Sequence, residues 1–455
     1  MFSDFIPSDK SVWQRQVEIE TKKPFSELNK DRNGEYRKIA PYYSIEEYDA
    51  NCFKQLHAAQ KKNPGWLNMP EIKIRDFSLT NTKIQEALRA GAQGVLIDAA
   101  AQQLNVPDCT RLLHQIRNTD TPVFIKTAQN PNQVFGLLSN HSGYQIKGGI
   151  AYDYLANWMR TLQPFDQNLT DLGAVCKETE SVKQFFPIMV ESHIFHNAGA
   201  TPEQELAYLL GSLVFYLDKL TDAGLSADLI LKKTFLSVSV GTEYLTEIAK
   251  LRALRLLYNR IAAAYGVEDD LPPYVHASIS SLYTSESSPY TNILRATSSA
   301  MSAVIGGCDL LTIPAFDQSF SDTNEFSERI ARNISSILLH ESYINQVIDP
   351  AAGSYYIDIQ SKQIADAAWQ LFLALEAQGG IITYFQSGYI QDQIEVSWQV
   401  KKELLRKDYV MVGVNKYRED PQNISKITKE NDLIKTGYRN LPNRNLSTYW
   451  NTHQQ

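Results

Sequence analysis

The chain has 455 residues, of which 43% are hydrophobic and 21% charged, a composition typical of a soluble globular protein with one large domain or two. Its formal net charge of -7 leaves no basic surface to neutralise phosphates, so nucleic acid is excluded as an expected partner. The start, MFSDFIPSDKSVWQRQVEIE, has no signal-peptide pattern, and no segment reaches the roughly 18 apolar residues of a membrane span. We therefore expect a cytoplasmic protein that binds no membrane. Its four cysteines are scattered without a CxxC pair, which argues against a disulfide framework and a cysteine zinc site.

Residues 1–70 are polar, aromatic and irregular, and they predict an N-terminal arm for subunit association. From residue 71, short apolar runs rich in β-branched side chains alternate with longer stretches of helical spacing. Eight runs predict strands: EIKIRDFSL (71–79), GVLIDAA (94–100), PVFIKTA (122–128), GGIAYDYLA (148–156), PIMVES (187–192), FLSVSV (235–240), YVHASIS (274–280) and DLLTIPA (309–315).

The clearest helix follows the fifth run. Thr201 suits the N-cap, Pro202 the first helical position and Gln204 the third position of a capping box, and leucines then recur at three- and four-residue steps until Gly224. This is the pattern of an amphipathic helix that covers a sheet.

Further helices are predicted over about 242–265 and 324–341. Eight strands alternating with helices favour a closed (β/α)8 barrel of the TIM type over residues 71–346, with an open doubly wound sheet as the alternative. A dinucleotide site has no support, because no GxGxxG follows the first strand. Residues 347–415 predict a C-terminal helical extension, and residues 416–455 a polar tail or linker, mobile or bound to a partner.

Polar side chains at the carboxyl ends of the strands would converge on a site at the barrel mouth. These candidates are Asp98, Lys126, Asp153, Glu191, His193, His196, Asn197, Ser237, Ser239, His276, Ser278 and Asp317. One hypothesis is that Glu191, His193 and His196 hold a divalent metal, with His276 as a further ligand. The alternative is that the first two histidines cap the following helix or fill the mouth, and that His276 is a satisfied core histidine.

Hydroxyl side chains alternate along the sixth and seventh strands, where bulky branched residues are usual. Ser237, Ser239 and Ser278 would lie on the barrel axis. They leave room for an elongated ligand, or else form a polar but packed interior.

Four segments resemble those of the coenzyme B12-dependent methylmalonyl-CoA mutases: HNAGATPEQELAYLL, EIAKLRALRLLYNRI, FSERIARN and HESYINQVIDPAAGSYYIDI. The resemblance covers about residues 186–415 with specific motifs and 1–185 more loosely. It implies a (β/α)8 barrel that threads an acyl-CoA along its serine-lined axis. It also implies a separate flavodoxin-like domain that brings cobalamin over the mouth for the radical isomerisation of methylmalonyl-CoA to succinyl-CoA.

The chain departs from that family at its catalytic residues. Aligned on AGA, SHIFHNAGA replaces the GYHMQEAGA of catalytic members, so that His193 takes the place of the tyrosine and Ile194 that of the catalytic histidine. The arginine of the SMRIISD segment has no match in KGGIAYD, and the TMY tyrosine has none in residues 1–70. Only His276, in HASIS, stands where the family has a histidine. No residue is therefore expected to be catalytic.

The resemblance also bears on cofactor and partner. No DxHxxG cobalamin motif occurs and the chain stops where the linker to the cobalamin domain would begin, so we expect it to bind no B12 itself. WQRQVEIETKKPFSEL and IAPYYSIEEYD are similar to the start of the small subunits of heterodimeric mutases. The resemblance thus implies a non-catalytic small subunit that stabilises a catalytic large subunit carrying adenosylcobalamin, with residual acyl-CoA binding possible.

Two alternatives remain open at this point. One is an active barrel subunit of a split mutase that uses cobalamin from a separate chain. The other is a metal-dependent barrel enzyme built on Glu191, His193 and His196.

Overall fold

The computed structural model describes residues 9–31, 38–142, 145–267, 271–407, 409–418, 434–435 and 438–453. Parts of the predicted arm and of the predicted tail, including 419–433, therefore lie outside the described residues. Across the described ranges, every helix is too short or too polar to span a lipid bilayer.

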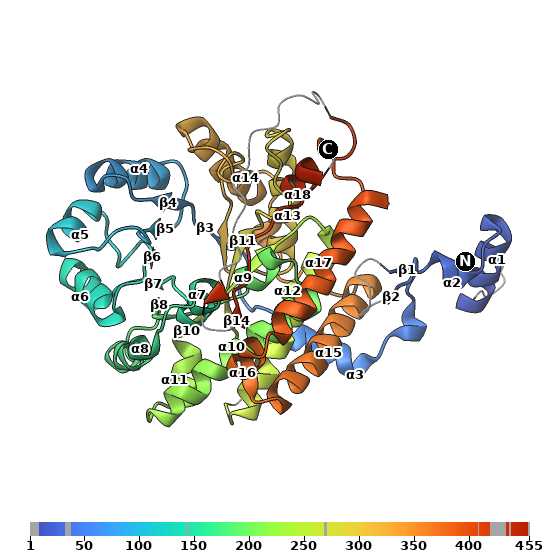
Figure 1. The fold of residues 1–455 in the computed structure, drawn as a ribbon, viewed down its shortest axis with the longest axis horizontal. Coiled ribbons are helices and arrows are strands. Elements are labelled where there is room, and N and C mark those ends of the chain that lie inside the picture. Colours follow the sequence, from blue (N-terminus) through green and yellow to red (C-terminus); the bar gives the residue numbers. More distant parts are fainter. Residues whose placement is uncertain are drawn as a thin grey trace.

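A closed barrel of parallel strands forms the centre of the chain (Figure 1). The ladders form two five-stranded sheets, ordered β3-β12-β11-β10-β9 and β4-β5-β6-β7-β8. They join because β3 and β4 are two parts of the first barrel strand, separated by Met69 and Pro70, and β8 and β9 are two parts of the fifth, separated by Pro187. The predicted (β/α)8 fold is confirmed. The strands are β3 Leu67–Asn68, β4 Glu71–Lys73, β5 Val95–Asp98, β6 Val123–Lys126, β7 Gly148–Ile150, β8 Phe185–Phe186, β9 Ile188–Glu191, β10 Thr234–Val240, β11 Tyr274–Ile279 and β12 Leu310–Thr312.

Two predicted strands were too long because an aspartate starts a helix inside each. In the run 71–79, the Asp76 carboxylate accepts the Leu79 N–H and begins helix α4, Phe77–Arg89. In the run 148–156, Asp153 accepts the Ala156 N–H and begins helix α7, Tyr154–Thr161. Such a cap satisfies a free helical N–H and ends the extended segment before it.

The fourth strand contains two glycines because its neighbours approach too closely for a side chain. A Cβ on Gly148 would lie 1.9 Å from the Val123 carbonyl oxygen, and one on Gly149 would lie 2.1 Å from that of Phe186. The main chains of the third and fifth strands therefore leave no room for a Cβ at these two positions, so only glycine fits there.

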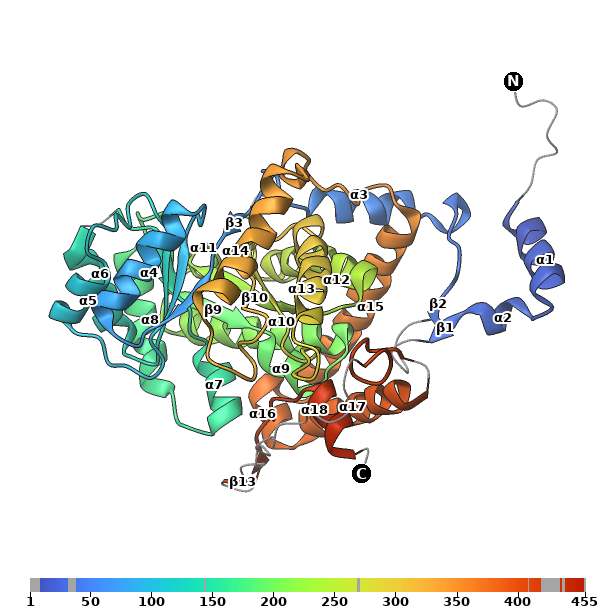
Figure 2. The same ribbon diagram turned by 90° about the horizontal axis from the view of Figure 1, so that it is seen from above.

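Helices cover the outside of the barrel, as Figure 2 shows for the helices between β4 and β9. The predicted capping box is confirmed: Thr201 accepts the Gln204 N–H, Pro202 opens the helix, and Gly224 follows its end with a φ of +85°. Besides α4 and α7, the covering helices are α5 Val106–Leu112, α6 Pro131–Ser142, α8 Asp166–Glu178, α9 His193–Ala198, α10 Pro202–Asp222, α11 Ala227–Lys232, α12 Tyr244–Ala264, α13 Thr291–Ile305 and α14 Glu325–His340.

The C-terminal helices pack against the second half of the barrel. A buried salt bridge joins Arg252 of α12 to Asp358 of α15, with 2.7 Å between Nη2 and Oδ1, and His57 lies 3.0 Å from the other carboxylate oxygen. This contact joins α12, a helix of the barrel, to α3 on its N-terminal side in the sequence and to α15 on its C-terminal side. The helices concerned are α3 Ala50–Ala58, α15 Tyr355–Ala377, α16 Gly380–Gln386, α17 Tyr389–Lys407 and α18 Leu446–His453.

Two segments near the C-terminus differ from the sequence expectation. Residues 409–415, at the end of the predicted helical extension, form turns and one bridge, Val412 to Lys416, instead of a helix. In the predicted tail, β13 Ile434–Lys435 and β14 Tyr438–Arg439 form a short pair, and residues 440–453 pack on the chain's own barrel.

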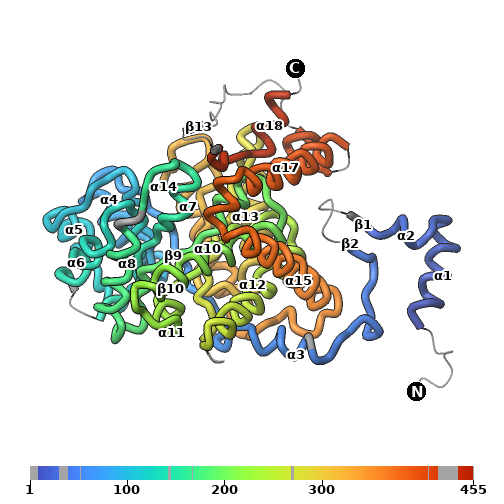
Figure 3. The backbone as a smooth tube through the Cα atoms, turned by 60° about the horizontal axis from the view of Figure 1, so that its bottom comes forward, coloured from blue at the N-terminus to red at the C-terminus, as the bar shows by residue number. Residues whose placement is uncertain are grey.

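The N-terminal arm stands apart from the barrel, as Figure 3 shows. It comprises α1 Lys10–Thr21, α2 Phe25–Leu28 and the antiparallel pair β1 Lys30–Asp31 and β2 Lys38–Ile39, followed by a turn of 3-10 helix at Ile45–Glu47. The Trp13 ring lies 5.7 Å from that of Phe25 and 4.8 Å from that of Tyr42. No residue of α1, all of which is described, is buried. The arm thus holds its own aromatic cluster and leaves the rest of α1 exposed.

Candidate functional site

A cavity of about 800 Å³ lies at the carboxyl ends of the barrel strands. Alternate side chains of each strand face the barrel axis, so the interior is built in layers. Along a strand, apolar inward-facing side chains come first and polar ones follow toward the mouth. This order is seen in Met69 and Glu71 of the first strand, and in Phe235, Ser237 and Ser239 of the sixth. The cavity therefore has an apolar floor and polar walls.

The floor is a packed apolar plug that fills the lower part of the axis. Phe124 and Phe235 lie edge to face with ring centroids 5.1 Å apart, and each is 1% exposed. Below them Phe186 stacks on Tyr274 at 4.5 Å. The plug has the members Met69, Leu96, Phe124, Ala151, Met189, Phe235 and Leu310, with Leu67, Phe186 and Tyr274 packed against it. The axis is thus closed at this level, and the cavity opens only toward the mouth.

Above the plug, two histidines belong to one directed chain of hydrogen bonds. The Thr312 hydroxyl donates to the Met69 carbonyl oxygen at 2.7 Å, so it accepts from His276 Nε2 at 2.9 Å. His276 Nδ1 is then an acceptor, and the Ser237 hydroxyl donates to it at 2.8 Å. Because a hydroxyl has one proton, Ser237 in turn accepts from His193 Nε2 at 2.7 Å.

The same chain ends at a third hydroxyl. His193 Nδ1 accepts from Ser239, 2.7 Å away. Burial lowers the pKa of His193, and burial with the nearby charges of His193 and Lys126 lowers that of His276 to about 3. Both imidazoles are therefore neutral, each with both nitrogens engaged. Neither offers a free lone pair to a metal or a substrate.

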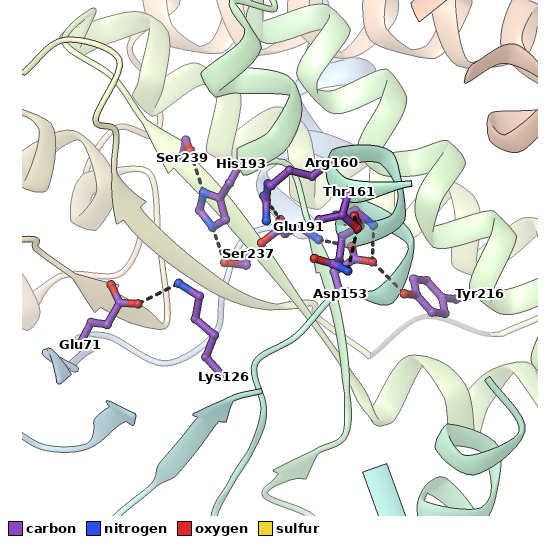
Figure 4. A network of polar contacts seen from close by, with 12 residues as sticks. Glu71, Lys126, Asp153, Arg160, Thr161, Glu191, His193, Tyr216, Ser237 and Ser239 are labelled. Atoms are coloured by element: carbon purple, nitrogen blue, oxygen red, sulfur yellow. Dashed lines mark hydrogen bonds and ion pairs between the residues drawn. The ribbon is translucent and has the colours of Figure 1, made fainter. Parts of the chain in front are cut away.

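Two ion pairs also line the cavity, and Figure 4 shows the pair of Glu191 beside His193. Lys126 Nζ lies 3.0 Å from Glu71 Oε1, and Arg160 Nη2 lies 2.9 Å from Glu191 Oε1. Burial lowers the pKa of Lys126, but the charges of Glu71 and Asp98 outweigh it and raise that pKa. These charges compensate one another within the wall, so neither Lys126 nor Arg160 is left unpaired for an anionic ligand.

Asp153 closes the barrel between the fourth and fifth strands. Its Oδ2 accepts the Glu191 N–H at 2.9 Å, and its Oδ1 accepts the Tyr216 hydroxyl at 2.8 Å (Figure 4). Burial, followed by the charge of Glu191, raises the pKa of Asp153 to about 7, against the effect of these donors. Its hydrogen bonds give this carboxylate a structural role.

His196 points away from the cavity into a buried charge cluster. Its Nδ1 lies 3.0 Å from Glu205 Oε2, which also pairs with Lys250 Nζ at 2.8 Å. The Ser192 hydroxyl donates to the other Glu205 oxygen at 2.6 Å. This cluster joins α9, α10 and α12 behind the mouth and holds His196 in a helix-packing role.

The three residues of the metal hypothesis thus have separate partners: Arg160 for Glu191, two serines for His193 and Glu205 for His196. Over the part of the chain that the structure describes, no three His, Cys, Asp or Glu side chains are grouped to hold a metal ion. The arrangement corresponds to the packed histidines of the alternative.

Most of the predicted mouth residues do line one cavity, and several lining residues escaped sequence analysis. Those predicted and found there are Lys126, Asp153, Glu191, His193, Asn197, Ser237, Ser239, His276 and Ser278, whereas Asp98, His196 and Asp317 are not among the lining residues. Sequence analysis did not predict two of the charged lining residues, Glu71 of the first strand and Arg160 of α7, the helix after the fourth strand. Residues 441–445 and 448 were also missed, because their segment has the composition of a tail.

Comparison with known proteins identifies the family of this barrel. A family model described as methylmalonyl-CoA mutase matches residues 36–441. The chain belongs to the methylmalonyl-CoA mutase family. At the position where this family's catalytic members are expected to have an imidazole, the cavity is lined by Ile194, which is 3% exposed.

The relatives include both kinds of mutase subunit. The methylmalonyl-CoA mutase small subunit of Porphyromonas gingivalis is 28% identical over 451 residues, which is 92% of this chain and 71% of that protein. The small subunit of Streptomyces virginiae is 32% identical over 277 residues, covering 60% of this chain and 44% of that protein. The Porphyromonas gingivalis large subunit is 31% identical over 293 residues, covering 62% of this chain and 41% of that protein. The chain therefore matches less than half the length of two of these three relatives.

Proposed function

We propose that this chain is the non-catalytic small subunit of a heterodimeric methylmalonyl-CoA mutase and stabilises the catalytic large subunit. The isomerisation of methylmalonyl-CoA to succinyl-CoA would take place entirely in that partner. The observation that carries the proposal is the mouth of the barrel, where Ile194 replaces the expected imidazole and the neighbouring His193 has both ring nitrogens engaged. The position expected to carry the family's catalytic imidazole is therefore apolar, and the neighbouring imidazole is committed to the barrel's own hydroxyls.

The closed axis supports the same proposal. A CoA ester is long, and to thread the barrel it would have to displace the Phe124 and Phe235 rings, which pack at 5.1 Å. A carboxylate in the cavity would also have to break an existing ion pair, since Lys126 is paired with Glu71 and Arg160 with Glu191. Weak binding of an acyl-CoA at the mouth would thus give no catalysis.

Adenosylcobalamin, the cofactor of the family, does not fit the residues of this cavity. The two imidazoles nearest the mouth donate and accept within the barrel, so neither is available as a cobalt ligand. We assign the cofactor to the large subunit.

The arm supplies a surface for the partner. Val12 and Ile19 lie two helical turns apart on α1 and are 48% and 64% exposed, while the neighbouring Trp13 packs against Phe25 and Tyr42. Exposed apolar side chains on a helix with a preformed aromatic support are suited to contact with a partner subunit.

The test is co-expression of the tagged chain with a large subunit from the same organism. We expect a 1:1 complex by size-exclusion chromatography with light scattering, and a weaker complex with Val12→Ser/Ile19→Ser. A matched control is Glu20→Ser, which changes an exposed polar position of the same helix. Recovery of a stable monomer that ignores the large subunit would refute the proposal.

A second measurement separates this proposal from an active split mutase. The substitution His193→Gln should leave the mutase activity of the complex unchanged, because the partner's barrel performs the reaction. A large loss of activity with the complex intact would assign catalysis to this chain instead.

A further inference from the structure

The described end of the chain returns across the barrel mouth. Residues 440–453, here named the C-terminal strap, comprise an extended stretch and helix α18, which lies beside α17 in Figures 1 and 3. Six strap residues contribute to the cavity wall: Leu441, Pro442, Asn443, Arg444, Asn445 and Thr448. The strap therefore forms part of the entrance.

Hydrogen bonds to three separate mouth segments hold the extended part of the strap. The Leu441 N–H donates to the Met159 carbonyl of α7 at 3.3 Å, and the Arg444 N–H donates to the Asn197 carbonyl of α9 at 2.8 Å. On the far side of the mouth, the Leu446 N–H donates to Leu282 at 2.9 Å. The strap thus spans from the helices after strands four and five to the loop after strand seven.

Two side chains strengthen these ends. The Asn445 amide donates to the carbonyls of Ser281 and Thr284 at 2.8 and 3.0 Å. The Arg444 guanidinium donates to the Ala198 carbonyl at 3.0 Å, pairs with Glu395 and lies 5.3 Å from the Trp398 ring centroid. A cation at the last carbonyls of α9 satisfies acceptors that the helix leaves free.

Apolar contacts hold the strap on both sides of these polar ones. Leu441 is 3% exposed and belongs to the main core. Leu446 and Tyr449 join a small apolar cluster with Trp398 of α17, separate from the main cores. Arg444 and Asn445 lie between these two apolar anchors, so removing both side chains would loosen the part of the strap over the entrance while leaving the anchors and the barrel intact.

We infer that the C-terminal strap is a gate that limits entry to the barrel cavity by molecular size, so that small solutes reach the polar walls and bulky molecules do not. This inference does not depend on the proposed subunit role. It follows from the position of the strap across the cavity entrance.

The experiment places a reporter thiol in the cavity of the full chain. Ser278→Cys lies in the cavity wall, and Ser78→Cys, on exposed helix α4, is the reference. Each is treated with iodoacetamide and with a maleimide carrying a polyethylene glycol of several kilodaltons, and the parent chain gives the background from native cysteines. We expect similar iodoacetamide rates at both sites, but a polymer rate at residue 278 at least about tenfold lower than at residue 78.

Loosening the strap should remove this size selection. In Ser278→Cys with Arg444→Ala/Asn445→Ala, the polymer rate should rise to within a few-fold of the reference, whereas Thr452→Ala on the exposed face of α18 should have no effect. Thermal unfolding of each variant reports whether the barrel is folded, and Asn445→Ala alone is the readout if the double variant is not. Equal polymer rates at residues 278 and 78 with the strap intact, or no rise after loosening, would overturn the inference.

Discussion

Truncation of Phe235 is the most direct perturbation of the apolar plug. The side chain is 1% exposed, and its ring centroid lies 5.1 Å from that of Phe124 and 6.4 Å from that of Phe186. Phe235→Ala removes the buried ring and leaves a cavity that surrounding strands cannot fill. We expect the free energy of unfolding to fall by about 3–5 kcal/mol.

A double-mutant cycle with Phe124→Ala tests the contact itself. An edge-to-face pair contributes about 0.5–1.5 kcal/mol beyond area burial, so the double variant should lose less than the sum of the single losses by about that amount. Urea unfolding followed by circular dichroism measures each term. Leu294→Ala is the control, because this residue is 71% exposed and its loss should be small. A loss below about 1 kcal/mol for Phe235→Ala would refute a packed plug.

Two further predictions concern buried charges. Asp358→Asn should lower the free energy of unfolding by about 3 kcal/mol, because it leaves Arg252, which is 0% exposed, with one fewer carboxylate. The control Asp366→Asn, in an exposed ion pair, should lower it by less than about 1 kcal/mol. Equal losses for the two variants in urea unfolding would contradict this prediction. Although burial opposes it, the charge of Lys250 lowers the pKa of Glu205 to about 2. A carboxylate whose pKa is lower in the folded state stabilises the protein above its unfolded pKa, so stability should fall by up to about 3 kcal/mol as the pH drops from about 5 to 2. Unfolding measured across this range should show a shallower slope for Glu205→Gln, and an unchanged slope would refute the assignment.

The barrel could be predicted because its signal is local: apolar runs and helical spacing alternate eight times, and the Thr201 capping box marks a helix start in three residues. The apolar plug could not be predicted from the sequence, because strands buried on both faces have apolar side chains at every position. Their sequence therefore does not show which side chains face the barrel axis and which face the helices. Phe124 and Ile125 are equally apolar, yet only the first belongs to the plug, while the second belongs to the core between strands and helices.

The candidate site was predicted only in part. The mouth position of His193 follows from its place after a strand, but its neutral, doubly engaged state depends on Ser237 and Ser239 from another strand. The pairing of Arg160 with Glu191 joins residues that are far apart in the sequence. The strap has the composition of a solvated tail, and its attachment rests on asparagine and arginine side chains that reach main-chain carbonyls, which composition does not reveal.

The division of two barrel strands by proline has a mechanical consequence. At β7–β8 and at β12–β3 only two residue pairs form each ladder, against six between β10 and β11. The barrel wall therefore has its shortest ladders along these two lines, and the Asp153 carboxylate, by accepting the Glu191 N–H, adds a contact across one of them. With the fewest hydrogen bonds to break, these lines are where a partner that presses on the barrel would first deform its wall.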